Sequence, residues 1–117
     1  TVVDTGHNID GITQVIYQIE NSRYHKLHIV YGTVSDKEID KILQILPKDA
    51  DYYFTMASIP RALDVKVLAA KAAFYGLVGS IHPTVMEALD SARKTAGPDD
   101  LVLVTGSTYV VAEALDN

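Results

Sequence analysis

The sequence of 117 residues contains no cysteine, no tryptophan and only four prolines. Without cysteine the chain can form neither a disulfide scaffold nor a thiolate metal site. This composition fits a reducing compartment, so we expect a cytoplasmic protein. No apolar stretch approaches the ~20 residues that a membrane-spanning helix requires. With 48% apolar and 21% charged residues, the chain is typical of a globular domain with an ordinary hydrophobic core.

Positive charge and phosphate-binding loops are also scarce. The 10 basic residues are outnumbered by 15 acidic ones, which gives a net charge of −5 and argues against a surface that tracks nucleic acid. Neither GxGxxG nor GxxxxGK[ST] occurs, so the chain by itself has no evident means of binding a triphosphate. No nucleophile-elbow motif occurs either, which disfavours a hydrolase triad.

Strand-like and helix-like segments alternate along the whole chain. The expected strands are rich in β-branched and aromatic residues and cover 2–3, 27–33, 51–55, 79–82 and 101–106. The expected helices show apolar residues at helical spacing and cover 9–20, 39–46, 64–77, 85–96 and 107–116. This alternation predicts one α/β domain of three layers, Rossmann-like, with a mostly parallel sheet and helices on both of its faces.

Three of the expected helices begin with recognisable capping residues. Ser35 and Glu38 have the spacing of a capping box, and so do Thr84 and Glu87. Asp64 stands at the start of the helix between them, where an aspartate can accept a hydrogen bond from the first turn. These residues predict where the three helices start.

Polar residues follow the first strand in the stretch "DTGHN". In a parallel α/β sheet, ligands bind outside the carboxyl ends of the strands, so these residues are candidates for a site. Asp4 could accept hydrogen bonds from a sugar diol, and His7 could donate to a carboxylate. A structural role explains them as well, since Asn8 suits a helix N-cap and Asp4 a turn.

Two further candidates follow other strands. Ser107 comes directly after the last strand, where it could bind the carboxylate or amine of an amino acid, or where Ser107 or Thr108 could cap the last helix. Arg61 lies in the loop after the third strand and could pair with a substrate carboxylate or remain solvated. His25 and His28 have no carboxylate or thiolate nearby in the sequence, so we interpret them as structural and expect no metal site.

Four segments, in chain order, resemble the C-terminal domain of folylpolyglutamate synthase/dihydrofolate synthase, in the Mur ligase superfamily. "VVDTGHNIDG" is similar to the family's strand–"DGAHNPDG"–helix opening, and "VYGTVSDKEIDKIL" to its "GxxxDKD" segment. "SIPRAL" is similar to its "xxPRA" loop, and "VTGSTYVVAEAL" to its "TGSLYLVGE" close. The chain departs from the pattern at Ile9, usually proline, and at Thr5-Gly6, usually Gly-Ala, and it keeps Asp4, His7 and Asn8.

This resemblance implies an ATP-dependent ligase. A P-loop ATPase domain, which these 117 residues do not include, would carry the Mg²⁺ ligands and bind the folate or dihydropteroate substrate. ATP would phosphorylate the substrate carboxylate, and the amine of L-glutamate would attack the acyl phosphate. Motif matching implies that Asp4 and Asn8 meet ATP and that His7, Ser107 and Arg61 position glutamate, with no catalytic base among them.

The resemblance and the first residue lead us to expect a piece of a longer protein, inactive by itself, because the chain opens with Thr1 inside an expected strand. Two alternatives stay open: a Mur-type cell-wall peptide ligase domain, and a free-standing α/β binding domain. The "DKE" and "TGSTY" segments favour the folate type. A GTNGKGS-like P-loop upstream in the reading frame would separate a ligase from the free-standing domain.

Overall fold

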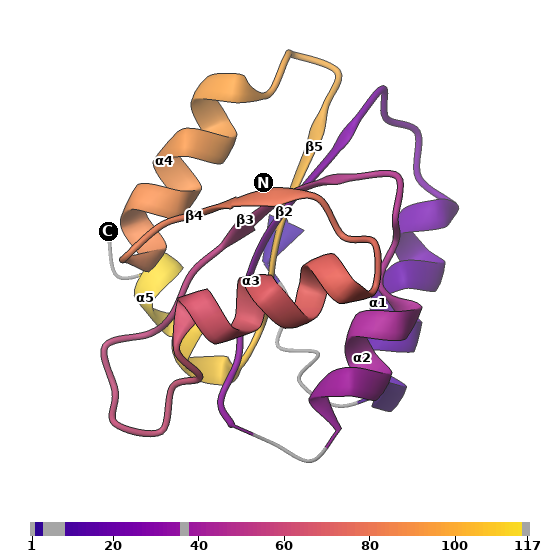
Figure 1. Ribbon diagram of the computed structural model, residues 1–117. Coiled ribbons are helices and arrows are strands. Elements are labelled where there is room, and N and C mark those ends of the chain that lie inside the picture. The colour runs from indigo at the N-terminus through magenta and orange to yellow at the C-terminus, as the bar shows by residue number, and fades with distance from the viewer. Residues whose placement is uncertain (1, 4–8, 36–37, 116–117) are drawn as a thin grey trace.

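The computed structural model describes residues 2–3, 9–35 and 38–115 (Figure 1). Within these ranges five strands alternate with five helices, as the sequence predicts. The strands are β1 (Val2–Val3), β2 (Leu27–Gly32), β3 (Asp51–Phe54), β4 (Gly79–Ile81) and β5 (Leu101–Gly106). The helices are α1 (Ile9–Glu20), α2 (Ile39–Ile45), α3 (Val65–Phe74), α4 (Val85–Thr95) and α5 (Thr108–Leu115). None of the helices in these ranges has the length and apolarity that crossing a membrane requires.

The five strands form one sheet in the order β1-β5-β2-β3-β4, and every neighbouring pair is parallel. The last strand in the sequence therefore lies between the first two. All six residues of β2 are buried, because β2 is the central strand and helices cover both of its faces. This all-parallel arrangement confirms the predicted α/β class.

Helices cover the two faces of the sheet unequally. The apolar sides of α1, α2 and α3 pack on one face, around Ile29 of β2 and Leu103 of β5. The apolar sides of α4 and α5 pack on the other face, around Val30 and Val104. Figure 1 shows α4 and α5 on the left and α1 and α2 on the right of the strands. The alternation of neighbouring strand residues between two cores confirms the predicted three layers.

Two of the three predicted helix starts are confirmed. Asp64 Oδ1 accepts a hydrogen bond from the Lys66 amide at 2.8 Å and caps α3. Thr84 Oγ1 accepts from the Glu87 amide at 3.2 Å and caps α4.

The predicted capping box at Ser35 is wrong. Glu38 is the N-cap of α2, and no side-chain hydrogen bond caps that helix. The Ser35 amide donates a hydrogen bond of 3.2 Å to the Arg61 carbonyl. This bond lies beside a bridge between Val34 and Ala62. The extended pairing after β2 thus continues past the point where the sequence pattern starts a helix, and α2 begins at Ile39.

Candidate functional site

The helices that follow the strands change from one face of the sheet to the other at β5. Its neighbours β1 and β2 are followed by α1 and α2 on one face of the sheet, whereas β5 is followed by α5 on the opposite face. Segments that leave adjacent strands toward opposite faces mark the place where parallel α/β proteins bind ligands, at the carboxyl edge of the sheet. The segments that follow β1, β5 and β2 are therefore the first place to look for a site.

Two glycines let the carboxyl ends of β2 and β5 approach each other closely. Gly106 has a φ of 120°, and a Cβ atom there would lie 1.9 Å from the Gly32 carbonyl oxygen. A Cβ atom at Gly32 would lie 2.6 Å from the carbonyl oxygen of Thr55. The Ser107 amide then donates to the Gly32 carbonyl at 3.0 Å. Glycine is required here because any side chain would separate these backbones.

Ser107 caps α5, as one of its two predicted roles requires. Its side-chain oxygen accepts a hydrogen bond from the Val110 amide at 3.2 Å, and the residue is only 4% exposed. A serine hydroxyl that accepts one hydrogen bond can still donate its own proton. Capping and contact with a substrate are therefore compatible, and the substrate contact stays a prediction.

The loop that carries Arg61 lies at the same edge. The Leu63 amide donates to the Thr33 carbonyl at 2.9 Å, and the Arg61 carbonyl accepts from Ser35, so the loop runs beside the segment after β2. Thr33 follows Gly32, the residue to which Ser107 is bonded. The structure thus brings the loop of Arg61 and the start of α5 together around the end of β2, and the Arg61 side chain is exposed.

The other three predicted site residues, Asp4, His7 and Asn8, lie outside the described residues, so their roles stay predictions. The residues on either side of this stretch are described. Val3 pairs with Val104 of β5, and Ile9 begins α1.

Two threonines are buried at the carboxyl edge of the sheet. Thr55, which follows β3, and Thr105 of β5 are both 0% exposed, and neither side-chain hydroxyl has a hydrogen-bond partner among the described residues. A buried hydroxyl without a partner costs free energy. The sequence analysis did not single out Thr55, because β-branched residues are ordinary in strands.

The amino edge of the sheet has a different character. The side chain of His28 lies between Tyr53 and Asp100, with Nδ1 2.9 Å from the tyrosine oxygen and Nε2 2.8 Å from Oδ2 of the aspartate. The Gly97 amide donates to the same carboxylate oxygen at 2.9 Å. This amide, and then His28, hold the pKa of Asp100 below its usual value. The carboxylate partner of His28 lies 72 residues away in the sequence, so the residues near His28 did not reveal it.

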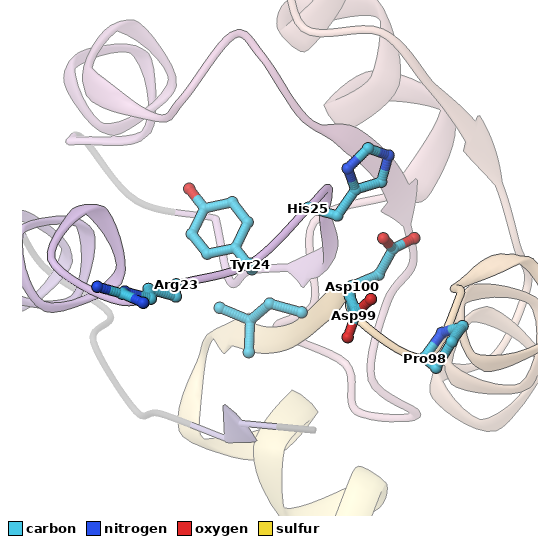
Figure 2. Close-up of a pocket in the computed structure, with 7 residues that line it drawn as sticks. Arg23, Tyr24, His25, Pro98, Asp99 and Asp100 are labelled. Atoms are coloured by element: carbon cyan, nitrogen blue, oxygen red, sulfur yellow. The ribbon is translucent and has the colours of Figure 1, made fainter.

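A pocket of about 460 Å³ also opens at the amino edge (Figure 2). It is lined by Arg23, Tyr24, His25, Pro98, Asp99, Asp100 and Leu101. The residues come from the segments that lead into β2 and β5, at the end of the sheet opposite Ser107. The lining mixes cationic and anionic side chains, and it contains His25, which the sequence analysis interprets as structural. We therefore place the candidate site at the carboxyl edge and not in this pocket.

The fold and this edge define a parallel α/β domain with its candidate ligand-binding residues around the switch strand β5. The model of the Mur ligase, glutamate ligase domain family matches residues 1–108. This chain therefore belongs to that family, which confirms the resemblance of its four motifs.

Similar proteins match this chain over almost its whole length. A probable bifunctional folylpolyglutamate synthase/dihydropteroate synthase of Haloferax volcanii is 41% identical over 116 residues, which are 97% of this chain and 14% of that protein. The Mycobacterium tuberculosis folylpolyglutamate synthase complexed with ADP and AMPPCP has a TM-score of 0.82 and 28% identity over 97% of this chain and 29% of that one.

A bifunctional folylpolyglutamate synthase/dihydrofolate synthase with Mn, AMPPNP and L-glutamate bound has a TM-score of 0.86 and 26% identity. The match covers 97% of this chain and 27% of that one. This chain thus spans about a seventh of the haloarchaeal relative and between a quarter and a third of the two solved chains.

Proposed function

We propose that this chain is the C-terminal domain of a folylpolyglutamate synthase, an ATP-dependent ligase that adds L-glutamate to a folate-type substrate. The relatives differ in the second activity that their names carry, dihydropteroate synthase in one and dihydrofolate synthase in another, and they share the first. The observation that carries the proposal is the meeting of two family motifs, the loop of Arg61 and the start of α5 at Ser107, around the end of β2.

Amide formation in such a ligase requires the glutamate amine to be held against an activated carboxyl group while water is kept out. In our proposal Arg61 binds a carboxylate of glutamate and Ser107 donates its hydroxyl proton to the same substrate. His7 would donate a further hydrogen bond to glutamate. These residues orient the amine and do not take its proton, so their contribution is positioning.

The nucleotide would be bound mainly by a P-loop domain of the same polypeptide, with Asp4 and Asn8 of this chain on its ATP side. Mg²⁺ would be held there too, as the resemblance to the ligase family implies. Closure of this domain over the P-loop domain would exclude water from the acyl phosphate. We place the reaction in the cytoplasm, where ATP is available.

The direct test is ADP release by the polypeptide that joins this chain to its P-loop domain. We expect ADP release to depend on both L-glutamate and a folate or dihydropteroate substrate. The 117-residue chain alone should melt cooperatively and release no ADP. Activity of the isolated chain above a heat-killed control would contradict the proposal. Preference for a nucleotide-linked peptide over folate would instead indicate a cell-wall ligase, and a reading frame without a P-loop would indicate a free-standing binding domain.

A further inference from the structure

A side chain of α5 binds the loop that carries Arg61. The Ser58 amide, three residues before Arg61, donates a hydrogen bond of 2.7 Å to Oε2 of Glu113. Glu113 belongs to α5 and lies 55 residues later in the sequence. A short bond from an amide to a carboxylate is stronger than a bond between neutral groups.

Backbone hydrogen bonds hold the opposite side of the same loop. Leu63 donates to Thr33, and Ser35 donates to the Arg61 carbonyl, so the segment after β2 fixes the end of the loop. Glu113 fixes its beginning. The loop is therefore held between the segment after β2 and α5, and Glu113 makes the attachment on the α5 side.

We propose that Glu113 is a positioning residue for glutamate binding, because it holds the loop of Arg61 at a fixed distance from the start of α5. This inference rests on the proposed function of Arg61. Ser107 caps α5 and Glu113 lies about two turns further along the same helix. One rigid helix thus sets the places of both groups that would receive the amino acid, and a displacement of the loop would move Arg61 relative to Ser107.

The test compares Glu113→Ala and Glu113→Gln with the control Glu20→Ala, an exposed glutamate at the end of α1 on the opposite edge of the sheet. Hydrogen exchange of the Ser58 amide is measured in the 117-residue chain. The KM and kcat for glutamate and the KM for ATP are measured in the joined ligase, the polypeptide that contains both this chain and its P-loop domain.

Glu113→Ala should expose the Ser58 amide to faster exchange. It should also raise the KM for glutamate about tenfold, the size expected when a hydrogen bond to a charged group is lost, with a smaller change in kcat and none in the KM for ATP. Glu113→Gln should restore both properties, since the amide oxygen of glutamine can accept from the same N–H group. Glu20→Ala should change neither.

Two results would overturn the inference. Unchanged Ser58 exchange in Glu113→Ala would show that the bond is not made, and faster exchange with an unchanged KM for glutamate would show that the bond does not position the site. An unmutated ligase without glutamate-dependent ADP release would refute the proposed function itself, before any variant is compared.

Discussion

The two edges of the sheet differ in the residues that hold them together: polar side chains at one edge and closely approaching backbones at the other. At the amino edge, the polar side chains of His28, Tyr53 and Asp100 are joined in one hydrogen-bonded network beside the pocket of about 460 Å³. At the carboxyl edge, glycines bring the backbones of β2 and β5 together, and the hydroxyls of Thr55 and Thr105 are buried without partners among the described residues. A hydrogen-bonded network is typical of a structural role, whereas the carboxyl edge at a topological switch is where parallel α/β proteins bind ligands.

The comparison teaches that a pocket of about 460 Å³ need not mark the better candidate. The amino-edge network fastens the turn between α4 and β5 to the sheet, because Asp100 bonds both to His28 of β2 and to the Gly97 amide. At the carboxyl edge, backbone hydrogen bonds and Glu113 instead hold the loop of Arg61, and the Arg61 side chain is exposed.

The largest expected effect is the loss of the close approach at the carboxyl edge. Gly106→Ala should lower the free energy of unfolding by about 3 kcal/mol or more, because the new Cβ would meet the Gly32 carbonyl and the φ of 120° disfavours a side chain. Gly97→Ala is the control, since its Cβ would have no neighbour nearer than 3.8 Å. Urea unfolding of both variants measures the difference, and equal stabilities would show that the two strand ends do not need to meet.

At the amino edge, Tyr53→Phe removes one partner of a buried imidazole. We expect a loss of about 2 kcal/mol in the free energy of unfolding, because His28 is only 1% exposed and its Nδ1 would be left unsatisfied. The control is Tyr17→Phe, whose ring is 69% exposed. Kinetics for glutamate should stay unchanged in the joined ligase, and a raised KM would show that the amino edge takes part in binding.

Two helix caps at the carboxyl edge separate stability from function. Ser107→Ala and Asp64→Ala each remove a side-chain cap and should each cost ~1 kcal/mol of stability. Only Ser107→Ala should also raise the KM for glutamate, because Asp64 caps α3, away from the switch strand. If both variants kept the normal KM, Ser107 would be a cap and no part of the site.

The smallest expected effect is a pH dependence confined to the amino edge. The pKa of Asp100 is lower in the folded chain than in the unfolded one, so its contribution to stability is complete above the ordinary aspartate pKa of about 3.9 and is lost as the pH falls through the lower, folded value. In Asp100→Asn, the free energy of unfolding should fall less as the pH is lowered, which urea unfolding between about pH 6 and pH 2 measures. Asp90→Asn, at an exposed aspartate, is the control. If Asp100→Asn left the loss of stability at low pH unchanged, other carboxylates would be responsible for that loss.

The sequence predicted the elements of this fold better than their contacts. Alternating strands and helices, and the caps Asp64 and Thr84, depend on neighbours within a few residues, so local patterns reveal them. The placement of β5 between β1 and β2 does not show in any local pattern. The failed capping box at Ser35 has the same cause, because pairing with the loop of Arg61 prevailed over a local signal.

The candidate site was predictable in its residue types and not in its connections. Arg61 and Ser107 were found because they follow strands and match family motifs. The bond from Ser58 to Glu113 spans 55 residues, and the bond from His28 to Asp100 spans 72, so neither could be predicted from spacing. Such contacts follow from the strand order, which only the three-dimensional structure supplies.

The central claim, that glutamate is bound at the carboxyl edge and not in the pocket of the amino edge, is tested most directly by two arginines. Both side chains are exposed; Arg61 lies at the first edge, and Arg23 lines the pocket at the second. The measurement is the KM for glutamate of Arg61→Ala and Arg23→Ala in the joined ligase. Our account predicts a rise of about tenfold or more for Arg61→Ala, the loss of a charge-assisted bond to a carboxylate, and no change for Arg23→Ala. A raised KM for Arg23→Ala with a normal one for Arg61→Ala would contradict it.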